Sequence, residues 1–197
     1  MMTAEQASPE TSTVAILLAA GGGRRFDSGT HKLLAPLRGR PVVAWSLDAV
    51  AAAGFAHVVV VTGAVPIDEL VPQGLVVVHH PGWAAGQAGS LHAGLRAARD
   101  LLGAERVVVG LADQPFVEAG CWCAVAASSS RPIAVATYAG VRGNPVRLDR
   151  QVWALLPTEG DAGARPLMRV RPDLVEEVPC IGSAADIDTT KDLERWT

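Results

Sequence analysis

The chain has 197 residues, enough for one substantial hydrophobic core and too few for two ordinary domains. A hydrophobic content of 49%, a charged content of 19% and a net charge of −3 favour a compact soluble protein and argue against a nucleic-acid partner, since such binders carry a strongly basic face. The aromatic content of 5% leaves few rings on which bases could stack. No apolar run approaches the roughly 18 residues that a membrane-spanning helix needs.

The cysteines and the N-terminal residues predict a simple cytoplasmic protein. Cys121, Cys123 and Cys180 are odd in number and have no paired spacing, so neither a disulfide framework nor a zinc site is expected. Residues 1–12 lack the cationic start and apolar stretch of a signal peptide. They are predicted to form a disordered tail before a single domain over residues 13–197.

The first predicted element is a strand that runs into a glycine-rich loop. The apolar run Val14 to Ala20 breaks into Gly21, Gly22 and Gly23, two arginines follow, and Lys32 comes shortly after them. Glycine lets the backbone approach an anion closely, whereas arginine and lysine supply charge for phosphate oxygens. A phosphate-binding loop is therefore predicted, with a glycine-rich turn bearing solvated arginines as the alternative. The loop lacks the last glycine of GxGxxG and the Gly-Lys-Ser/Thr ending of a Walker loop.

Strands and helices alternate along the rest of the chain. Strands are predicted over 57–62, 75–78, 107–111, 133–138 and 174–178, and residues 146–148 are expected to be extended after a loop over 140–145. Helices are predicted over 42–53, 67–71, 91–102, 121–127, 151–156, 165–170 and 189–196. This order predicts an α/β fold, a mostly parallel sheet with helices on both faces. Because ligands bind at the carboxyl ends of such strands, the glycine loop, the loop ending at Ser90 and Asp113 are expected along one rim.

Two carboxylates are candidates for a metal site. Asp113 directly follows a predicted buried strand, where its carboxylate would face the phosphate loop. Mg²⁺ prefers oxygen ligands and usually shares them with substrate phosphates. Asp188, in the acidic run Asp186-Ile-Asp188, is the second candidate, although this run could instead cap the last helix.

Other polar positions have both a functional and a structural interpretation. Ser90 precedes a predicted helix whose first N–H groups could bind an anion, or it serves as the N-cap of that helix. The loops Asn144-Pro145 and 160–165 could line a pocket or only turn the chain. Trp83 could wall a substrate pocket or pack in the core. The pair His79-His80 is expected to be solvated.

A series of short motifs occurs in order along the chain. The series consists of Leu18-Ala-Ala-Gly21, Arg24-Arg25, Lys32-Leu33-Leu34, Gln87-Ala-Gly-Ser90-Leu91, Asp113-Gln-Pro115, Gly143-Asn-Pro145, Gly160-Asp-Ala-Gly-Ala-Arg165 and Asp186-Ile-Asp-Thr189. It resembles the molybdenum-cofactor nucleotidyltransferases, the MobA-like NTP-transferase family, and is most similar to the molybdopterin cytidylyltransferase branch. The resemblance covers nearly the whole chain after residue 13. It implies a Rossmann-like nucleotidyltransferase fold and transfer of a nucleoside monophosphate from an NTP to a phosphorylated acceptor, with release of pyrophosphate.

The resemblance also implies roles for individual residues. The nucleotide and its triphosphate would be held by the glycine loop and its neighbours, namely Leu18, Ala19, Ala20, Gly21, Gly22, Arg25, Lys32 and Ser90. Arg25, Lys32 and Asp113 would be the catalytic residues, and Asp113 with Asp188 would hold Mg²⁺. Asn144, Asp161 and Arg165 would lie on the acceptor side. This sequence departs from the family pattern at Gly23, which is usually serine, at Asp27, which is usually glycine, and in a longer segment before Lys32.

The favoured interpretation is a cytoplasmic, Mg²⁺-dependent cytidylyltransferase that transfers CMP from CTP to molybdopterin. Ala20 completes the form Leu-Ala-Ala-Gly that the resemblance associates with cytidylyl rather than guanylyl transfer. Guanylyl or other transfer to a different phosphorylated acceptor, such as a sugar phosphate, is an alternative. A non-catalytic NTP-binding chaperone that serves a cofactor or a molybdoenzyme is another. An NAD(P) oxidoreductase is disfavoured because the fingerprint glycine is missing, and neither a nucleic acid nor a membrane is an expected partner.

Overall fold

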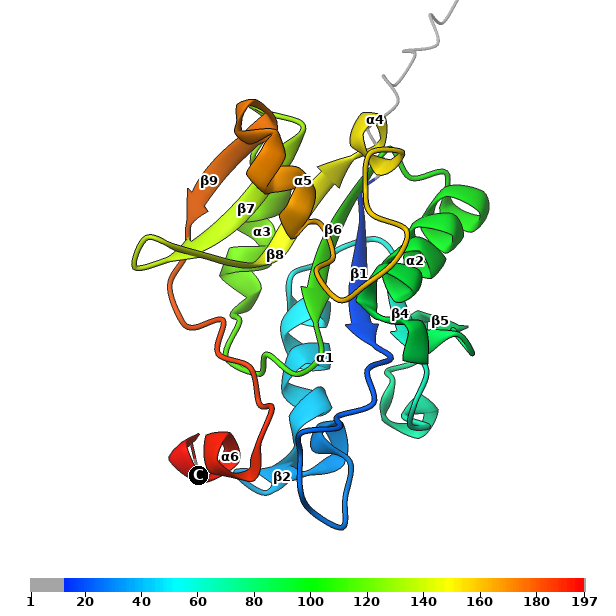
Figure 1. The fold of residues 1–197 in the computed structure, drawn as a ribbon, viewed down its shortest axis with the longest axis vertical. Helices are drawn as coiled ribbons and strands as arrows, with labels where there is room; N and C mark the ends of the chain where they lie inside the picture. The colour runs from blue at the N-terminus through cyan, green and yellow to red at the C-terminus, as the bar shows by residue number, and fades with distance from the viewer. Residues whose placement is uncertain (1–12, 197) are drawn as a thin grey trace, which may run out of the picture.

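A seven-stranded sheet forms the centre of the protein (Figure 1). The computed structural model describes residues 13–196, so the tail predicted over 1–12 lies outside the described residues. The strands are β1 (Thr13–Ala19), β4 (Val58–Thr62), β5 (Val76–His79), β6 (Arg106–Leu111), β7 (Ile133–Tyr138), β8 (Val141–Asp149) and β9 (Val175–Pro179). Their order is β5-β4-β1-β6-β8-β7-β9, and β8 alone runs antiparallel to its neighbours among these strands. The predicted mostly parallel α/β sheet is confirmed.

Helices cover both faces of the sheet, as Figure 1 shows. The helices are α1 (Val42–Ala52), α2 (Gln87–Leu102), α3 (Ala119–Ala127), α4 (Arg150–Trp153), α5 (Arg165–Val170) and α6 (Thr190–Trp196). Alternate residues of β1 point to opposite faces, so Ile16 packs in the cluster with α2 and α5, whereas Leu17 packs with α1 and α3. Burial on both faces explains why the central strands are continuous apolar runs.

Several predicted boundaries were wrong, and the helix predicted over 151–156 is the shorter α4, Arg150–Trp153. Helix α2 begins at Gln87 rather than at residue 91, because Gly86 (φ 118°) ends the preceding turn and the 160–161 loop accepts hydrogen bonds from its first amides. The residues of the predicted 140–145 loop from Val141 onward belong to β8, which forms a hairpin with β7. The helix predicted over 67–71 is a single 3₁₀ turn, Asp68–Leu70.

A small apolar cluster fixes the end of the glycine loop against the C-terminal segment. It consists of Phe26, Ala35, Leu37, Val42 and Ile187, next to the two-stranded ribbon of β2 (Pro36–Leu37) and β3 (Arg40–Pro41). The side chains of Phe26 and Ile187 are 8% and 0% exposed. Since Phe26 follows Arg25 and Ile187 precedes Asp188, this cluster brings a cation and a carboxylate from distant parts of the chain together.

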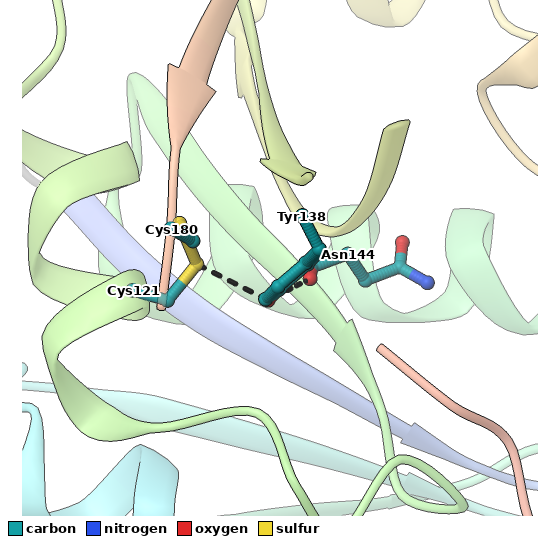
Figure 2. Close-up of a disulfide and its surroundings, with 4 residues drawn as sticks. All are labelled: Cys121, Tyr138, Asn144 and Cys180. Carbon is teal, nitrogen blue, oxygen red and sulfur yellow. Dashed lines mark hydrogen bonds between the residues drawn. A yellow bond between two sulfur atoms is a disulfide. The ribbon is translucent and has the colours of Figure 1, made fainter. Parts of the chain in front are cut away.

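A disulfide joins Cys121 of α3 to Cys180, which follows β9 (Figure 2). The prediction of no disulfide was therefore wrong. The two cysteines are 59 residues apart, and they meet because β9 pairs with β7 and Cys180, just after β9, packs in the cluster on the face that α3 covers. Cys123, on the same helix, is free and exposed. Within residues 13–196 no helix is long and apolar enough to cross a membrane.

Candidate functional site

A cleft of about 400 Å³ lies at the carboxyl ends of β1 and β6. It brings together side chains and backbone from five separate segments of the sequence, namely Gly21 to Arg25, Lys32, Ser90, Asp113 and Asp188, with Trp83, Asp161, Arg165 and Asp186 also in its wall. Leu18 and Ala20 line the base of the cleft, and Ala19 is buried beside them at the end of β1. The rim expected from the rule for parallel sheets is therefore formed.

Lys32 is at the centre of the charges in this cleft. Its Nζ lies 2.5 Å from Asp113 Oδ2 and 2.8 Å from Asp188 Oδ1. The side chains of Lys32, Asp113 and Asp188 are 10%, 19% and 22% exposed, so water screens these ion pairs only partly. Arg25 Nη2 lies 2.8 Å from the other oxygen of Asp188, and the Arg25 side chain is 76% exposed. The longer segment before Lys32 thus leaves its ammonium inside the cleft.

The ion pairs shift the protonation equilibria of the cleft. Burial lowers the pKa of Lys32, but the charges and hydrogen bonds of Asp113 and Asp188 outweigh it, so the net pKa is raised and the ammonium stays charged. Burial, together with the charge of Asp113, raises the pKa of Asp186 above its usual value, and the hydrogen bond from Gln114 opposes that shift. The cleft therefore holds several carboxylates close together, and their negative charges favour the binding of a cation.

Asp113 has an oxygen suited to a metal ion. Its Oδ1 is buried and has no hydrogen-bond partner among residues 13–196, whereas Oδ2 pairs with Lys32. An unpartnered buried carboxylate oxygen is costly unless a ligand or cation meets it. In the part of the chain that the structure describes, no three His, Cys, Asp or Glu side chains are grouped to hold a metal unaided. Asp113 and Asp188 fit Mg²⁺, which commonly uses one or two carboxylates and takes its other ligands from substrate phosphates and water.

The glycine loop is shaped by its neighbours. A Cβ added to Gly22 would lie 2.6 Å from the ring of Trp83, so only glycine allows the indole to pack on this loop. Gly23 has φ +59° and its C=O accepts a hydrogen bond from Phe26 N at 2.9 Å, which closes the turn that carries Arg24 and Arg25. Trp83 thus forms a wall of the cleft, one of the two interpretations that its sequence position allowed.

Ser90 lies in the first turn of α2, and is not its N-cap. The loop predicted to turn the chain or line a pocket does cap this helix, because Asp161 Oδ1 accepts from Gln87 N at 3.2 Å and Gly160 O accepts from Ala88 N at 2.9 Å. Asp161 consequently lines the cleft with the glycine loop. Ser90 is 4% exposed and lines the same cleft.

A second cavity, of about 460 Å³, adjoins the first through Leu18, Gln87 and Arg165. Aliphatic side chains from the sheet, α2 and α5 form most of its wall, among them Leu91, Val109, Val135, Val146 and Met168. Asn144, Arg142, Arg165 and Arg169 add polar and positive groups. Two of the three residues predicted for the acceptor side, Asn144 and Arg165, lie here.

Sequence reasoning did not single out Gln114, whose side chain links Asp186 of the first cleft to Asn144 of the second cavity. Its Nε2 donates to Asp186 Oδ1 at 2.7 Å, and its Oε1 accepts from Asn144 Nδ2 at 3.1 Å. The Tyr138 hydroxyl in turn donates to Asn144 O at 2.7 Å and lies 3.2 Å from Cys121 Sγ (Figure 2). The position of Gln114 between Asp113 and Pro115 was the available sequence signal.

Two histidines have environments that the sequence did not predict. His80 Nε2 is buried without a hydrogen-bond partner among the described residues, and the ring packs on Gly89, so this histidine is not simply solvated. His31, to which no role was given, contacts the glycine loop through Gly21 O at 3.0 Å. Its position next to Lys32 was the only sequence signal.

The sheet order, the glycine and arginine loop after β1, and the carboxylate after β6 define an α/β protein of the nucleotidyltransferase fold. The model of the MobA-like NTP transferase domain matches residues 15–177. The chain therefore belongs to the MobA-like NTP transferase family.

Known proteins of similar sequence or structure span nearly the whole chain. A protein named nicotine blue oxidoreductase, from Paenarthrobacter nicotinovorans, is 32% identical over 91% of this chain and 94% of its own. A nucleotidyl transferase from Methanothermobacter superposes with a TM-score of 0.81 over 93% of this chain and 95% of its own, at 23% identity. A manganese complex of Rv0371C from Mycobacterium tuberculosis H37Rv superposes with a TM-score of 0.73 over 94% and 98% of the two chains, at 29% identity.

Proposed function

We propose that this protein is an Mg²⁺-dependent nucleotidyltransferase that transfers CMP from CTP to molybdopterin and releases pyrophosphate. The observation that carries the proposal is the position of Lys32 Nζ between Asp113 and Asp188, beside the glycine loop, with Asp113 Oδ1 left unpartnered in the described chain. Cations and carboxylates meet at one point of a cleft, as a triphosphate and its metal require. A cytoplasmic location belongs to this proposal, because that is where NTPs are supplied.

The residues of the first cleft would act by binding and orientation. The Gly21 and Gly22 backbone, Arg25 and Lys32 would hold the triphosphate, with Leu18, Ala20 and Ser90 around the nucleoside and Ala19 beside them in β1. An oxygen of the acceptor phosphate attacks the α-phosphorus, a new P–O bond forms, and the bond to the β-phosphate oxygen breaks. The developing charge needs neutralisation and in-line positioning rather than a protein nucleophile. Mg²⁺, held by Asp113 and Asp188, would add charge neutralisation at the phosphates.

The second cavity suits an acceptor with a planar ring system and an anionic end. Its wall is mostly aliphatic, and Arg142, Arg165 and Arg169 could meet a phosphate. Molybdopterin has a planar pterin ring, whose faces can lie against aliphatic side chains, and a phosphate for the arginines; Asn144 could meet the polar edge of the ring. A sugar phosphate has no such flat ring face to place on the aliphatic wall, and its hydroxyls require hydrogen-bonding partners.

The base preference rests on Ala20. This residue is 2% exposed, and its methyl lies 2.9 Å from the position of a Cβ added to Gly63. Ala20 is among the residues that line the cleft, and the form Leu-Ala-Ala-Gly that it completes supports a pyrimidine. Activity with CTP over GTP is expected, and Ala20→Gly should narrow the difference; equal use of CTP and GTP by the unmodified protein would remove the cytidylyl assignment.

A melting-temperature panel with CTP, GTP, ATP and UTP, each with and without Mg²⁺, followed by a pyrophosphate-release assay with molybdopterin, tests the proposal. A ligand at a hundred times its Kd stabilises the folded state by about 2.7 kcal/mol, which a melting curve detects. Lys32→Ala should weaken NTP binding roughly tenfold or more, the scale of a lost charged hydrogen bond. Lys191→Ala, at an exposed position of α6, is the matched control.

Two other functions make different predictions in the same experiments. A non-catalytic cofactor chaperone would bind NTP without pyrophosphate release. A redox function is favoured by the full-length relative named as an oxidoreductase, and disfavoured by the missing fingerprint glycine. Oxidation of NADH or NADPH with a quinone-like dye, in the absence of NTP, would support the redox function.

A further inference from the structure

His31 uses both ring nitrogens on backbone groups of the cleft. Leu33 N donates to Nδ1 at 3.2 Å, and Nε2 lies 3.0 Å from Gly21 O. An amide N–H can only donate, so Nδ1 is the acceptor and the proton is on Nε2, which donates to the Gly21 carbonyl. One neutral imidazole in one tautomer satisfies both contacts.

These two contacts join the two halves of the phosphate site. Gly21 is in the loop after β1, and Leu33 follows Lys32 in a 3₁₀ turn whose N-cap is His31. The ring therefore fixes the distance between the loop backbone and the lysine. Between Phe26, which is buried, and His31 the chain passes through the exposed residues 27–30.

Gly23 provides the space that His31 needs. A Cβ added at this position would lie 3.2 Å from His31 Nε2 and 3.2 Å from Lys32 Cγ, and φ is +59°. The family pattern usually has serine here. This sequence departs from the family pattern at Gly23 and in the longer segment that carries His31. The two departures are linked, because the glycine leaves room for the histidine ring.

We infer that His31 is a positioning residue for the proposed nucleotidyl transfer: it tethers the glycine loop to the Lys32 turn, so that loop amides and lysine face one triphosphate. The inference rests on the proposed function for its ligand, and on the two hydrogen bonds for its geometry. Loss of one neutral hydrogen bond should weaken NTP binding roughly two- to tenfold, with little change in kcat.

Two substitutions separate the tether from the helix cap. In His31→Asn the side-chain oxygen can replace Nδ1 as the cap of Leu33 N, but the side chain is too short to reach Gly21 O. In His31→Gln the longer amide can donate to Gly21 O. His57→Ala, at an exposed position at the opposite end of the sheet, is the control.

The variants are compared by melting temperature, by Kd and KM for CTP with Mg²⁺, and by hydrogen exchange of the amides of residues 21–25 without ligand. We expect His31→Asn to keep its melting temperature, to raise Kd and KM severalfold, and to exchange faster in the loop. His31→Gln should lie closer to the unmodified protein. Unchanged loop exchange and unchanged Kd in His31→Asn would overturn the inference.

A failure of the proposed function has a separate signature. If the unmodified protein binds no nucleotide, the transferase proposal fails, and the exchange rates decide the tether alone. Faster exchange of residues 21–25 in His31→Asn then supports the tether, and equal exchange overturns it. If His31→Asn lowers the melting temperature and speeds exchange throughout the protein as much as in residues 21–25, His31 is a purely structural residue. That result would also overturn the inference.

Discussion

Asp113 differs from the other carboxylates of the cleft because its two oxygens have different environments. Oδ2 pairs with Lys32, whereas Oδ1 is buried with no partner in the described chain. One oxygen therefore orients the lysine and the other is free for a cation. The proposed metal role depends on the negative charge, and the geometry depends on the shape of the side chain.

Asp113→Asn should lower Mg²⁺-dependent turnover at least about a hundredfold, the scale seen when one preorganised electrostatic group is removed. The substitution keeps the shape and removes the charge. Steady-state rates over a range of Mg²⁺ concentrations measure the effect. Asp173→Asn, at an exposed position outside both cavities, is the control. Turnover close to that of the unmodified protein would mean that the metal is held elsewhere.

His31 gives the fold a pH dependence of known sign. Burial lowers the pKa of His31, the hydrogen bond to Gly21 O opposes this, and the charge of Lys32 lowers the pKa further. A histidine with a lowered pKa in the folded state binds fewer protons than in the unfolded chain, so stability rises with pH. The contribution is complete above the usual value of 6.5 and is lost as the pH falls from there to the lowered pKa.

The melting temperature should therefore fall more steeply from pH 7 to pH 5 in the unmodified protein than in His31→Asn, which has no titrating group at this position. Subtracting one profile of melting temperature against pH from the other removes the contribution of the titrating groups that both proteins share. Parallel pH profiles would show that His31 titrates alike in the folded and unfolded states.

For single residues, the sequence predicted which charged side chains lie together in the cleft better than it predicted the contacts that they make. Lys32, Asp113 and Asp188 lie together in the structure because each follows or precedes an element whose apolar pattern was readable. Side-chain directions in the folded chain decide three further features. These are the ion pairs of Lys32 with Asp113 and Asp188 (the Lys32 bridge), the hydrogen bonds of Gln114, and the contacts of His31. No spacing in the sequence encodes those directions.

The helices and strands were predicted where one hydrophobic pattern decided the structure. Helix α5 and strand β7 have the predicted bounds. Strand β7 is an apolar segment between turn residues, and α5 has a proline in its first turn. The predicted starts of helix α2 and strand β8 were wrong. The start of α2 depends on a partner distant in sequence, the 160–161 loop that caps it. The polar start of β8 is extended because it continues the hairpin with β7.

The Cys121–Cys180 disulfide ties α3 to the segment that carries Asp186 and Asp188. A cross-link that closes a loop of this length contributes about 2–4 kcal/mol to the free energy of unfolding, chiefly by restricting the unfolded chain. Cys180→Ser should lower the melting temperature by several degrees, and Cys123→Ser should leave it unchanged.

A count of thiols tests the cross-link itself. The unfolded protein should have one reactive thiol before reduction, that of Cys123, and all three of its cysteines should react after reduction. Three reactive thiols before reduction in freshly purified protein would contradict the disulfide. That result would also restore the cysteine-based argument for a reducing, cytoplasmic environment.

For the whole molecule, the sheet could be predicted more fully than the cleft. Alternating strands and helices give a mostly parallel sheet, and the rim rule then gives the side on which ligands bind. The volume and lining of the two cavities come from packing between segments far apart in sequence, such as α5 against β8 and Trp83 against Gly22. The cluster around Ile187, which brings the C-terminal carboxylates to the cleft, has no local signature either.

The charge balance of the cleft predicts that metal and nucleotide stabilise the protein together. Without ligand, Asp113 Oδ2 and both oxygens of Asp188 already pair with Lys32 and Arg25, so Mg²⁺ alone must compete with two cations. A triphosphate gives Lys32 and Arg25 new anionic partners, which frees the carboxylates for the metal.

We expect Mg²⁺ alone to leave the melting temperature nearly unchanged, and CTP alone to raise it slightly. CTP with Mg²⁺, at about a hundred times its Kd, should raise the melting temperature by about 5–10 °C. Additive shifts, or the full shift with Mg²⁺ alone, would mean that the carboxylates bind metal independently of the nucleotide and that the Lys32 bridge does not control the site.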